Sequence, residues 1–414
     1  MRVTAAFNKI LDLIGACVTA VAFEPEEGLW TVTVRLRRRK LICPHCQFCT
    51  RSRYDTRGVD STWRALDLGK WKVTVAARLR RLACPTHGVV VEGVPFAQYG
   101  SRFVADFEDL VAWLATRMDK TSVTRLCRID WRTVGAIVGR VAADKLDPAR
   151  LDGLYDIGID EVAYRKGHKY LTVVTNHANG KVVWTGQGRD ADAAKAFFEQ
   201  LGPERSHRLA AVSMDMSAAY AKAVGEHAER ATIVWDPFHV VQLANKALDA
   251  VRRAHWNALR AQAGAEAAKR FKGARWALRK RPENLTDRQA VALGEVERAG
   301  GKVWRAYQLK EALRAVFAGD LAQDEVAELL DRFLSRAARC RIPELVKLGR
   351  TIRAHRHGIL EAVRLGLSNA RAEALNAKIK LIIRRARGFH SVPALQALIM
   401  LGCGPIELAL PHEK

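Results

Sequence analysis

Apolar and polar positions alternate along residues 29–40, LWTVTVRLRRRK, before the pattern ends in a basic cluster. This alternation predicts a strand that leads to a phosphate-facing edge. A second strand-like and basic stretch, WKVTVAARLRRLACPTHG, covers residues 71–88. Residues 103–146 change to a helical period in three short segments. The first 150 or so residues therefore predict small strand-rich and helix-rich modules.

Strand patterns return at residues 154–160, 169–176 and 181–186, and NHANG at 176–180 is a good hairpin turn between the last two. A helix, a strand, a helix and a strand are then expected in turn, followed by a helix that begins near His239. Three consecutive strands followed by this alternation predict a mixed five-stranded sheet with helices. The following residues, 256–345, are helical and basic without a strand pattern.

A late amphipathic helix is predicted for residues 368–389, SNARAEALNAKIKLIIRRARGF. One face carries polar residues at steps of four, three, four and four: Asn369, Glu373, Asn376, Lys380 and Arg384. The other face is apolar and is expected to pack on the sheet through Ala372, Leu375, Ile379, Ile382 and Ile383. Glu373 is the lone carboxylate of this helix, and Ala377 follows four residues later, so we expect it to pair with Lys380.

The charge balance points to a polyanionic partner. The 414 residues include 68 Lys and Arg against 44 Asp and Glu, a formal charge of +24. Nucleic acid is the first candidate for such an excess, and a merely soluble basic surface is the alternative. No apolar run of about 18 residues predicts a membrane span, and the N-terminal stretch does not read as a signal peptide.

Two short cysteine and histidine motifs predict a structural zinc site. Cys43-x-x-Cys46 and Cys84-x-x-His87 each let two ligands approach one ion from a tight turn, and four N/S ligands suit tetrahedral Zn²⁺. Cys49 and His45 are rival ligands on the first turn. The flanking RLRRRK and RLRR favour a zinc ribbon laid on DNA; the alternative is a set of unconnected buried thiols.

Residues 119–146 predict a helix-turn-helix. A short helix is followed by a turn at Ile129–Asp130 and a second helix from Trp131, which Asp130 can cap. The expected apolar stripe is Val123, Leu126, Val134, Ile137 and Val138, and the polar and basic positions are Ser122, Arg125, Arg128, Arg132 and Arg140. The second helix could enter the major groove, although any small helical bundle would show a similar period.

Three acids could hold two Mg²⁺ or Mn²⁺ ions. Asp160, near the C-terminal part of its strand, shares a face with Asp156 and Gly158, and Asp215 ends the strand 209–215, where it could instead merely cap the next helix. Glu373 on the late helix is the third. Hard oxygen ligands suit these metals, and two such ions promote phosphodiester displacement. The basic residues after Glu373 would hold the phosphate backbone: Lys378, Lys380, Arg384, Arg385 and Arg387.

The whole pattern resembles a known family. The zinc ribbon, the helix-turn-helix, IGIDEVAYRKGHKY, VSMD, WDPFHVV and the late helix, in that order, resemble bacterial DDE transposases of the ISL-three group, which have a ribonuclease-H-like catalytic domain. The resemblance implies that Asp160, Asp215 and Glu373 are catalytic and that Lys380 contacts DNA beside the cleaved phosphate. It gives a supporting role to Asp236 and His239 of a D-x-x-H motif, and we expect the same of Asn369 and Asn376. One departure is Cys84-x-x-His87, where relatives often have a second Cys.

The resemblance also implies an organisation and a mechanism. We expect an α/β chain with small modules, divided into an N-terminal segment 1–35, a zinc ribbon 36–96, a helix-turn-helix 100–150, a catalytic core 151–255 and 346–414, and an all-helical insertion 256–345. The implied reaction is metal-dependent hydrolysis at the ends of an insertion sequence, followed by attack of the freed 3′-hydroxyls on target DNA. The expected cofactors are two Mg²⁺ (or Mn²⁺) and one structural Zn²⁺.

The expected partners are double-stranded DNA, at the element's terminal inverted repeats and at the target, and further copies of the chain in a dimer or larger synaptic complex. The expected location is the bacterial cytoplasm, on the nucleoid. Rival interpretations are a DNA-binding regulator that has lost catalysis and a nuclease or resolvase of the same fold. A single-strand transposase with a Tyr nucleophile fits poorly, because His355-Arg356-His357 has a charged centre and no Tyr is nearby.

Overall fold

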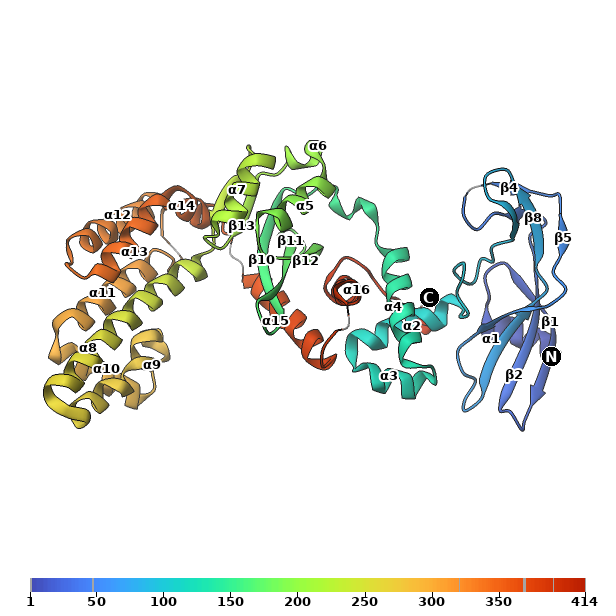
Figure 1. Ribbon diagram of the computed structural model, residues 1–414, viewed down its shortest axis with the longest axis horizontal. Helices are drawn as coiled ribbons and strands as arrows, with labels where there is room; N and C mark the ends of the chain where they lie inside the picture. The colour runs from blue at the N-terminus through green and yellow to red at the C-terminus, as the bar shows by residue number, and fades with distance from the viewer. Residues whose placement is uncertain (1, 47, 320, 368–369, 390, 414) are drawn as a thin grey trace. The chain divides into compact units, whose positions relative to one another are not determined.

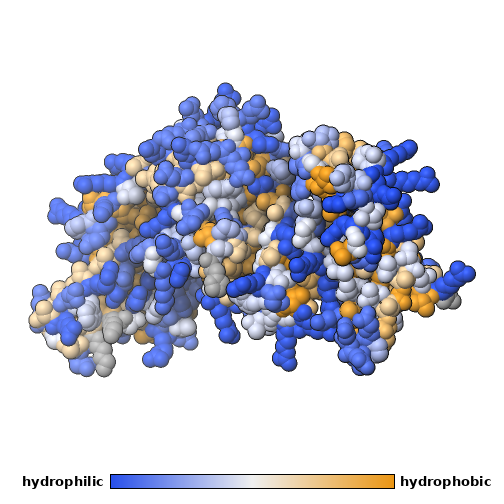
Figure 2. Space-filling view, turned by 45° about the vertical axis from the view of Figure 1, so that its right-hand side comes forward, coloured by the Kyte–Doolittle hydropathy of each residue, from blue (hydrophilic) through white to orange (hydrophobic). Residues whose placement is uncertain are grey.

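The computed structural model describes residues 2–46, 48–319, 321–367, 370–389 and 391–413. It forms two compact units (Figure 1). The first comprises residues 1–147, 384–402 and 406–414, and the second comprises residues 148–383 and 403–405. Hydrophilic residues cover most of the face shown in Figure 2. Within the described ranges, no helix is both long and apolar enough to cross a bilayer.

A four-stranded sheet begins the first unit. Its order is β1-β2-β7-β6, with bounds Ala16–Glu24, Leu29–Leu36, Lys72–Ala77 and Ser61–Arg64. The strand expected at residues 29–40 therefore ends at Leu36, and the basic cluster that follows is a loop. Helix α1 (Val3–Leu11) packs on β1. Val32, Val75 and Trp63 are buried in this sheet, as strict alternation of apolar positions predicts.

Five short strands carry the cysteine and histidine motifs. β3 (Leu41–Ile42) pairs with β4 (Cys49–Thr50), and a three-stranded sheet has the order β5-β8-β9, with bounds Asp55–Thr56, Arg80–Cys84 and Gly88–Val91. Each motif thus occupies a tight turn between two paired strands, as a zinc ribbon requires.

The helix-turn-helix prediction is confirmed in its elements. Helices α2, α3 and α4 span Ala105–Arg117, Lys120–Cys127 and Trp131–Lys145. The side chain of Asp130 caps α4 by accepting a hydrogen bond from the Thr133 amide at 2.9 Å. One position of the expected apolar stripe was predicted wrongly, because Leu126 is 59 % exposed. Cys127, one full turn after Val123, takes the buried place, since positions four apart share a helix face.

The C-terminal elements join the two units. Helix α15 (Ala370–Arg385) begins in the second unit and ends in the first, and helix α16 (Val392–Cys403) follows it. A 3-10 turn at Pro411–Glu413 packs against α2.

The second unit contains the predicted mixed five-stranded sheet. After a 3-10 turn at Pro148–Leu151, its strands have the order β12-β11-β10-β13-β14, with bounds Lys181–Gln187, Lys169–Asn176, Asp156–Arg165, Ala211–Met214 and Thr232–Trp235. β10, β11 and β12 are antiparallel, whereas β13 and β14 run parallel to β10. The expected place of Asp160 near the end of its strand is wrong: β10 continues to Arg165, because its pairing with β11 extends to Arg165 opposite Lys169.

Helices cover this sheet and continue its core. Helices α5, α6 and α7 span Ala191–Leu201, Pro203–Ser206 and Ala218–His227, and α5 packs against α7 and β12. One apolar cluster extends from Ile157 and Val212 in the sheet to Leu330 and Ile352 in the helical part. Burying one continuous cluster stabilises the sheet and the helices together.

The residues after the sheet are helical, as expected. Helices α8 and α9 span Pro237–Gly273 and Arg275–Arg279, and the 3-10 turn η2 spans Pro282–Asn284. Helices α10, α11 and α12 span Asp287–Ala299, Gly301–Ala315 and Gln323–Arg339. Helices α13 and α14 span Pro343–Ala354 and Arg356–Arg364. Gly264, with φ of 82°, kinks α8. α14 packs on β14. The limits proposed for the helical insertion, 256 and 345, fall inside α8 and α13.

Candidate active site and metal centre

Asp160 lies in the middle of β10, and its carboxylate is held on both sides. The Glu161 amide donates to Oδ1 at 2.7 Å, and Asn376 on α15 donates through Nδ2 to Oδ2 at 2.6 Å. Residues 216 positions apart are thereby joined. The bond places α15 beside β10, as Figure 1 shows.

Asp215 follows the last residue of β13. Burial raises the pKa of its carboxyl, the positive field of His239 opposes that rise, and the negative charge of Asp160 adds to it. The Oδ1 atom of Asp215 is buried and has no hydrogen-bond partner among the described residues. A buried, unsatisfied carboxylate oxygen is costly unless a cation or donor completes it.

Glu373 lies in the first turn of α15, and Asp160 acts on its carboxyl as it does on that of Asp215. Burial raises the pKa of its carboxyl, and the charges of Asp236 and Asp160 raise it further, whereas His239 and Lys380 lower it. Lys380 is the smallest of these influences, so the expected pairing of Glu373 with Lys380 is weak. Asp160, Asp215 and Glu373 therefore share one electrostatic neighbourhood.

Asp236 and His239 stand where β14 passes into α8. Asp236 is 1 % exposed, and its Oδ2 lies 3.7 Å from Nε2 of His239. Both residues act on the other acids: His239 lowers the pKa of Asp215, and Asp236 raises the pKa of Glu373. The parallel strands β13 and β14 end at the same edge, which explains why Asp215 and Asp236 come together.

The acids suit hard divalent cations. Carboxylate oxygens that repel one another and a buried oxygen without a donor are the features expected of an Mg²⁺ or Mn²⁺ site. Their oxygens do not all lie within 4.8 Å of one another, since the one group of three or more such ligands found at that spacing among the described residues is a cysteine and histidine cluster. A two-ion arrangement, in which one acid is shared and the others bind separate ions, has no need of that spacing.

The late helix α15 has an apolar face and a basic face. Ile379 and Ile382 are buried, while Lys378, Lys380, Arg384 and Arg387 are exposed. Asn369 and the side chain of Ala372 lie outside the described residues.

Two residues near the acids, Glu161 and Lys246, were not among the site residues predicted from the sequence. Glu161 is half-buried 3.5 Å from Arg189, and burial together with the charges of Asp215 and Asp160 raises the pKa of its carboxyl against the field of Arg189. Lys246 lowers the pKa of Asp215. Lys246 lies seven residues after His239, which is two turns along α8. This helical spacing places both residues on one face, and it could have identified Lys246 from the sequence.

The four predicted zinc ligands do converge. Sγ of Cys43 and Sγ of Cys84 lie 3.7 and 3.5 Å from Nδ1 of His87, and Sγ of Cys46 lies 3.7 Å from that of Cys84. All four ligand atoms lie within 4.8 Å of one another, so this Cys₃His set could hold a zinc ion. The rivals are outside it: Cys49 is exposed, and the His45 ring is tilted by 35° against that of His87, with the ring centroids 5.1 Å apart.

The surroundings of Cys84 favour its deprotonated thiolate form. Although burial raises the pKa of the Cys84 thiol, hydrogen bonds from His87 and Thr86 outweigh it and lower the pKa to about 6. Thiolates are the form that binds zinc.

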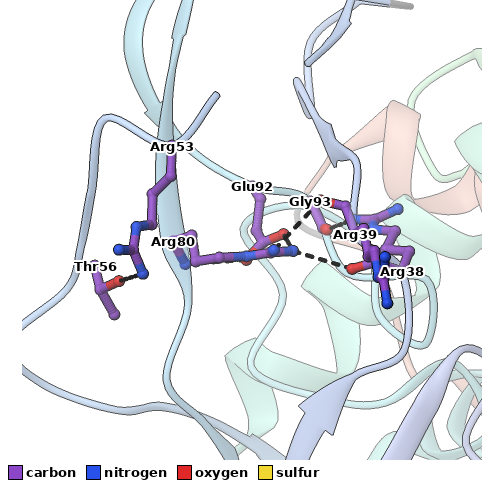
Figure 3. A network of polar contacts seen from close by, with 7 residues as sticks. All are labelled: Arg38, Arg39, Arg53, Thr56, Arg80, Glu92 and Gly93. Carbon is purple, nitrogen blue, oxygen red and sulfur yellow. Dashed lines mark hydrogen bonds and ion pairs between the residues drawn. The ribbon is translucent and has the colours of Figure 1, made fainter. Parts of the chain in front are cut away.

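A buried ion pair braces the basic loop beside this cluster (Figure 3). Arg80 donates to the two oxygens of Glu92 at 2.8 and 2.6 Å, and Glu92 is 3 % exposed. The same guanidinium reaches the carbonyl oxygens of Arg38 and Arg39, at 3.3 and 3.5 Å, and Arg38 donates to the Gly93 carbonyl. The loop after β2 is therefore fixed by a side chain of β8.

The helix-turn-helix divides its arginines between structure and surface. Arg140 pairs with the buried Glu108, and Arg128 pairs with Asp67 and donates to the Lys70 carbonyl at 2.9 Å. Arg125 and Arg132 are exposed. Two of the predicted basic positions thus stabilise the first unit, and two face solvent.

Comparison with known proteins gives matches along most of the chain. A family described as transposase matches residues 157–399, and the helix-turn-helix domain of transposase family ISL3 matches residues 92–142. The transposase for insertion sequence element IS1557 of Mycobacterium tuberculosis is 43 % identical over 394 residues, which are 89 % of this chain and 88 % of that protein. The transposase for insertion sequence element IS1001 of Bordetella parapertussis is 32 % identical over 271 residues, 65 % of this chain and 66 % of that protein.

These matches place the chain among the transposases, enzymes that process DNA. Within that class it belongs to the ISL3 family, as the resemblance of its motifs implied. Membership also implies DNA binding through the helix-turn-helix.

Proposed function

We propose that this chain is a DDE transposase that binds the terminal inverted repeats of its insertion sequence, cuts there and joins the freed 3′ ends to target DNA. The observation that carries the proposal is the shared electrostatic neighbourhood of Asp160, Asp215 and Glu373, built from a strand, a strand end and a separate helix. The five-stranded sheet, with its antiparallel hairpins and two parallel strands, supports a ribonuclease-H-like core.

In this proposal Asp160, Asp215 and Glu373 would hold two Mg²⁺ or Mn²⁺ ions, which would supply stabilisation of the charge that develops on oxygen during phosphodiester displacement. Asn376 keeps the Asp160 carboxylate turned toward α15. His239 offsets the repulsion that Asp160 exerts on Asp215 and on Glu373, and Asp236 positions His239.

DNA is held by cations on both units. Lys380, Lys378, Arg384, Arg385 and Arg387 on and after α15 contact the phosphate backbone, and Arg125 and Arg132 of the helix-turn-helix contact the element ends, with Arg128 beside them. The Cys₃His cluster would hold one structural Zn²⁺, which would fix the ribbon. Two element ends must meet for joining, so the acting form is a dimer or a larger synaptic complex.

The test uses purified chain, Mg²⁺ and a duplex that carries the DNA flanking the gene. Asp160→Asn, Asp215→Asn and Glu373→Gln should each abolish cleavage and leave duplex binding intact. The matched control is Glu199→Gln on α5, an exposed carboxylate paired with Lys195 at 3.7 Å, which should leave cleavage unchanged. Cleavage retained in any of the three variants would remove that residue from the site.

A second readout separates transposase from nuclease. Precut ends with free 3′-hydroxyls should be joined to a supercoiled plasmid by the unaltered chain. Cleavage without joining would show a nuclease of the same fold, and binding without either reaction would show a DNA-binding regulator.

A further inference from the structure

Two adjoining recesses lie in the first unit between the helix-turn-helix and the segment that ends α15. The larger, of about 460 Å³, is lined by Arg117, Met118, Asp119, Arg384, Arg385 and Arg387. The smaller, of about 200 Å³, shares Asp119, Arg385 and Arg387 with it and adds Lys120, Thr121, Trp131 and Ala386. Segments some 260 positions apart in the chain therefore form one basic hollow.

The charges around this hollow are not balanced. Among the described residues, Arg117, Arg384 and Arg387 form no ion pair with a carboxylate. The one acid in the lining, Asp119, is committed elsewhere, because it caps α3 by accepting hydrogen bonds from the amide and hydroxyl of Ser122 at 3.0 and 2.6 Å. Cations gathered without a counter-ion create a positive potential that attracts an anion.

Lys120 is positioned rather than free in solvent. Its ammonium lies 3.4 Å from the centre of the Trp131 ring, and a Cβ built at Gly135 would come within 2.9 Å of Nζ. The missing side chain of Gly135 on α4 thus leaves room for this ammonium. Burial lowers the pKa of Lys120 against the opposing field of Asp130, as expected for a cation partly removed from water.

The opposite wall is fixed as well. Arg385 donates to the carbonyl oxygen of Thr116, in the last turn of α2, at 3.3 Å. Arg387 takes a left-handed backbone conformation, with φ of 50°, as the chain turns out of α15. The hollow is therefore held together by a hydrogen bond between its two walls.

We propose that this hollow binds phosphate groups of the DNA backbone, with Arg117 and Lys120 as contacts beside Arg384, Arg385 and Arg387. The inference rests on the proposed function and assigns the start of α3 to the backbone, separately from any base reading by α4. Paired recesses rich in guanidinium groups suit the phosphodiesters of a duplex, because guanidinium forks match phosphate oxygens. The end of the helix that carries Glu373 thereby shares its DNA contact with the helix-turn-helix.

The test is the salt dependence of binding to a random-sequence duplex, measured by fluorescence anisotropy with the full chain. Each phosphate contact contributes about 0.9 to the slope of log K against log salt concentration. Lys120→Met and Arg117→Gln should each reduce the slope by about that amount, and Lys120→Arg should restore it. Arg208→Gln is the control, since Arg208 is exposed and precedes β13, away from the strand end that carries Asp215.

The outcomes separate this inference from the proposed function. The unaltered chain could show a steep slope that Lys120→Met and Arg117→Gln both retain. That result would overturn the assignment of the hollow as a DNA-backbone site and leave the transposase proposal standing. Absence of salt-dependent binding by the unaltered chain would overturn both. Inorganic pyrophosphate is the second probe: if it raises the melting temperature of the unaltered chain but not of Lys120→Met, while the slopes are equal, the hollow takes a small phosphate and not DNA.

Discussion

Asn376 on α15 donates a hydrogen bond to Oδ2 of Asp160 on β10 at 2.6 Å. This contact links the late helix to the central strand of the sheet. Because Glu373 lies one turn before Asn376 on the same helix, the contact also sets where Glu373 meets the other acids. An amide that donates to a carboxylate fixes its orientation without adding charge.

Removal of this amide should slow cleavage without abolishing it. Loss of a partner that orients a metal-binding side chain typically lowers activity about 10- to 100-fold, and we expect that range for Asn376→Ala in single-turnover cleavage. Asn376→Asp should be slower still, because a second carboxylate would face Asp160. The control is Asn257→Ala on α8, an exposed position. Full activity in Asn376→Ala would show that the bond has no part in orienting Asp160.

Asp215→Asn should stabilise the metal-free chain at neutral pH. The folded-state pKa of Asp215 is raised, mainly by burial, so its ionisation disfavours the folded state. The neutral form stabilises the fold at pH values below the unfolded pKa of about 3.9, and this stabilisation is lost as pH rises through the folded pKa. Thermal unfolding should therefore show a higher melting temperature for the variant at pH 7, and no difference at the acid end.

Mg²⁺ should reverse that order. An ion that binds only the folded chain stabilises it by about 2.7 kcal/mol at one hundred times its dissociation constant, and the variant has lost one ligand. Asp192→Asn, an exposed change on α5, should respond to Mg²⁺ as the unaltered chain does. Equal stabilisation of Asp215→Asn by Mg²⁺ would argue against Asp215 as a ligand.

Periodicity predicted the elements well wherever burial is one-sided. The alternation of apolar residues in β2 and the helical period of α3 and α4 are local patterns, and the turn at Ile129–Asp130 lies where the cap chemistry of Asp130 requires it. The four zinc ligands could be chosen because a tight turn brings both ligands of a pair to one ion. The prediction that Leu126 is buried was wrong, because the sequence of a helix of only eight residues defines its buried face poorly.

Contacts made across long sequence separations could not be predicted in the same way. Nothing in the local pattern of β10 indicates that Asn376 bonds Asp160, or that Arg385 reaches the end of α2. The length of β10 beyond Asp160 depends on its pairing with β11, which is a tertiary feature. Strand and helix patterns indicated the three acids, and the family resemblance implied that they are catalytic. The structure adds how burial and His239 shift the pKa of two of them.

Cys43→Ser should remove the metal from the first unit. Elemental analysis of the unaltered chain should give about one zinc per chain, as four N/S ligands predict. Cys49→Ser is the matched control, because Cys49 is exposed at the start of β4, after that turn, and lies outside the cluster. Loss of zinc in both variants, or in neither, would contradict the assigned ligand set.

Glu92→Gln should destabilise the loop after β2. Breaking a buried ion pair typically costs about 3–5 kcal/mol, and we expect a smaller loss of about 2 kcal/mol because Arg80 is partly exposed and keeps some hydration. The control is Asp60→Asn, which breaks the exposed pair with Arg78 and should cost less than about 1 kcal/mol. Urea unfolding measures both, and equal losses would show that burial of Glu92 adds nothing.

Gly358→Ala should loosen the packing of α14 on the strand that leads to Asp236. A Cβ at Gly358 would lie 2.5 Å from the Ile233 carbonyl oxygen and 2.6 Å from the Trp235 ring, and the carbonyl oxygen belongs to β14 itself. Overpacking of this kind costs about 1–3 kcal/mol. Gly294→Ala on α10 is the matched control, because its Cβ meets nothing within 4 Å and alanine favours a helix by about 1 kcal/mol. Urea unfolding should therefore show opposite signs for the two substitutions, and a stabilising Gly358→Ala would contradict the close approach of α14 to β14.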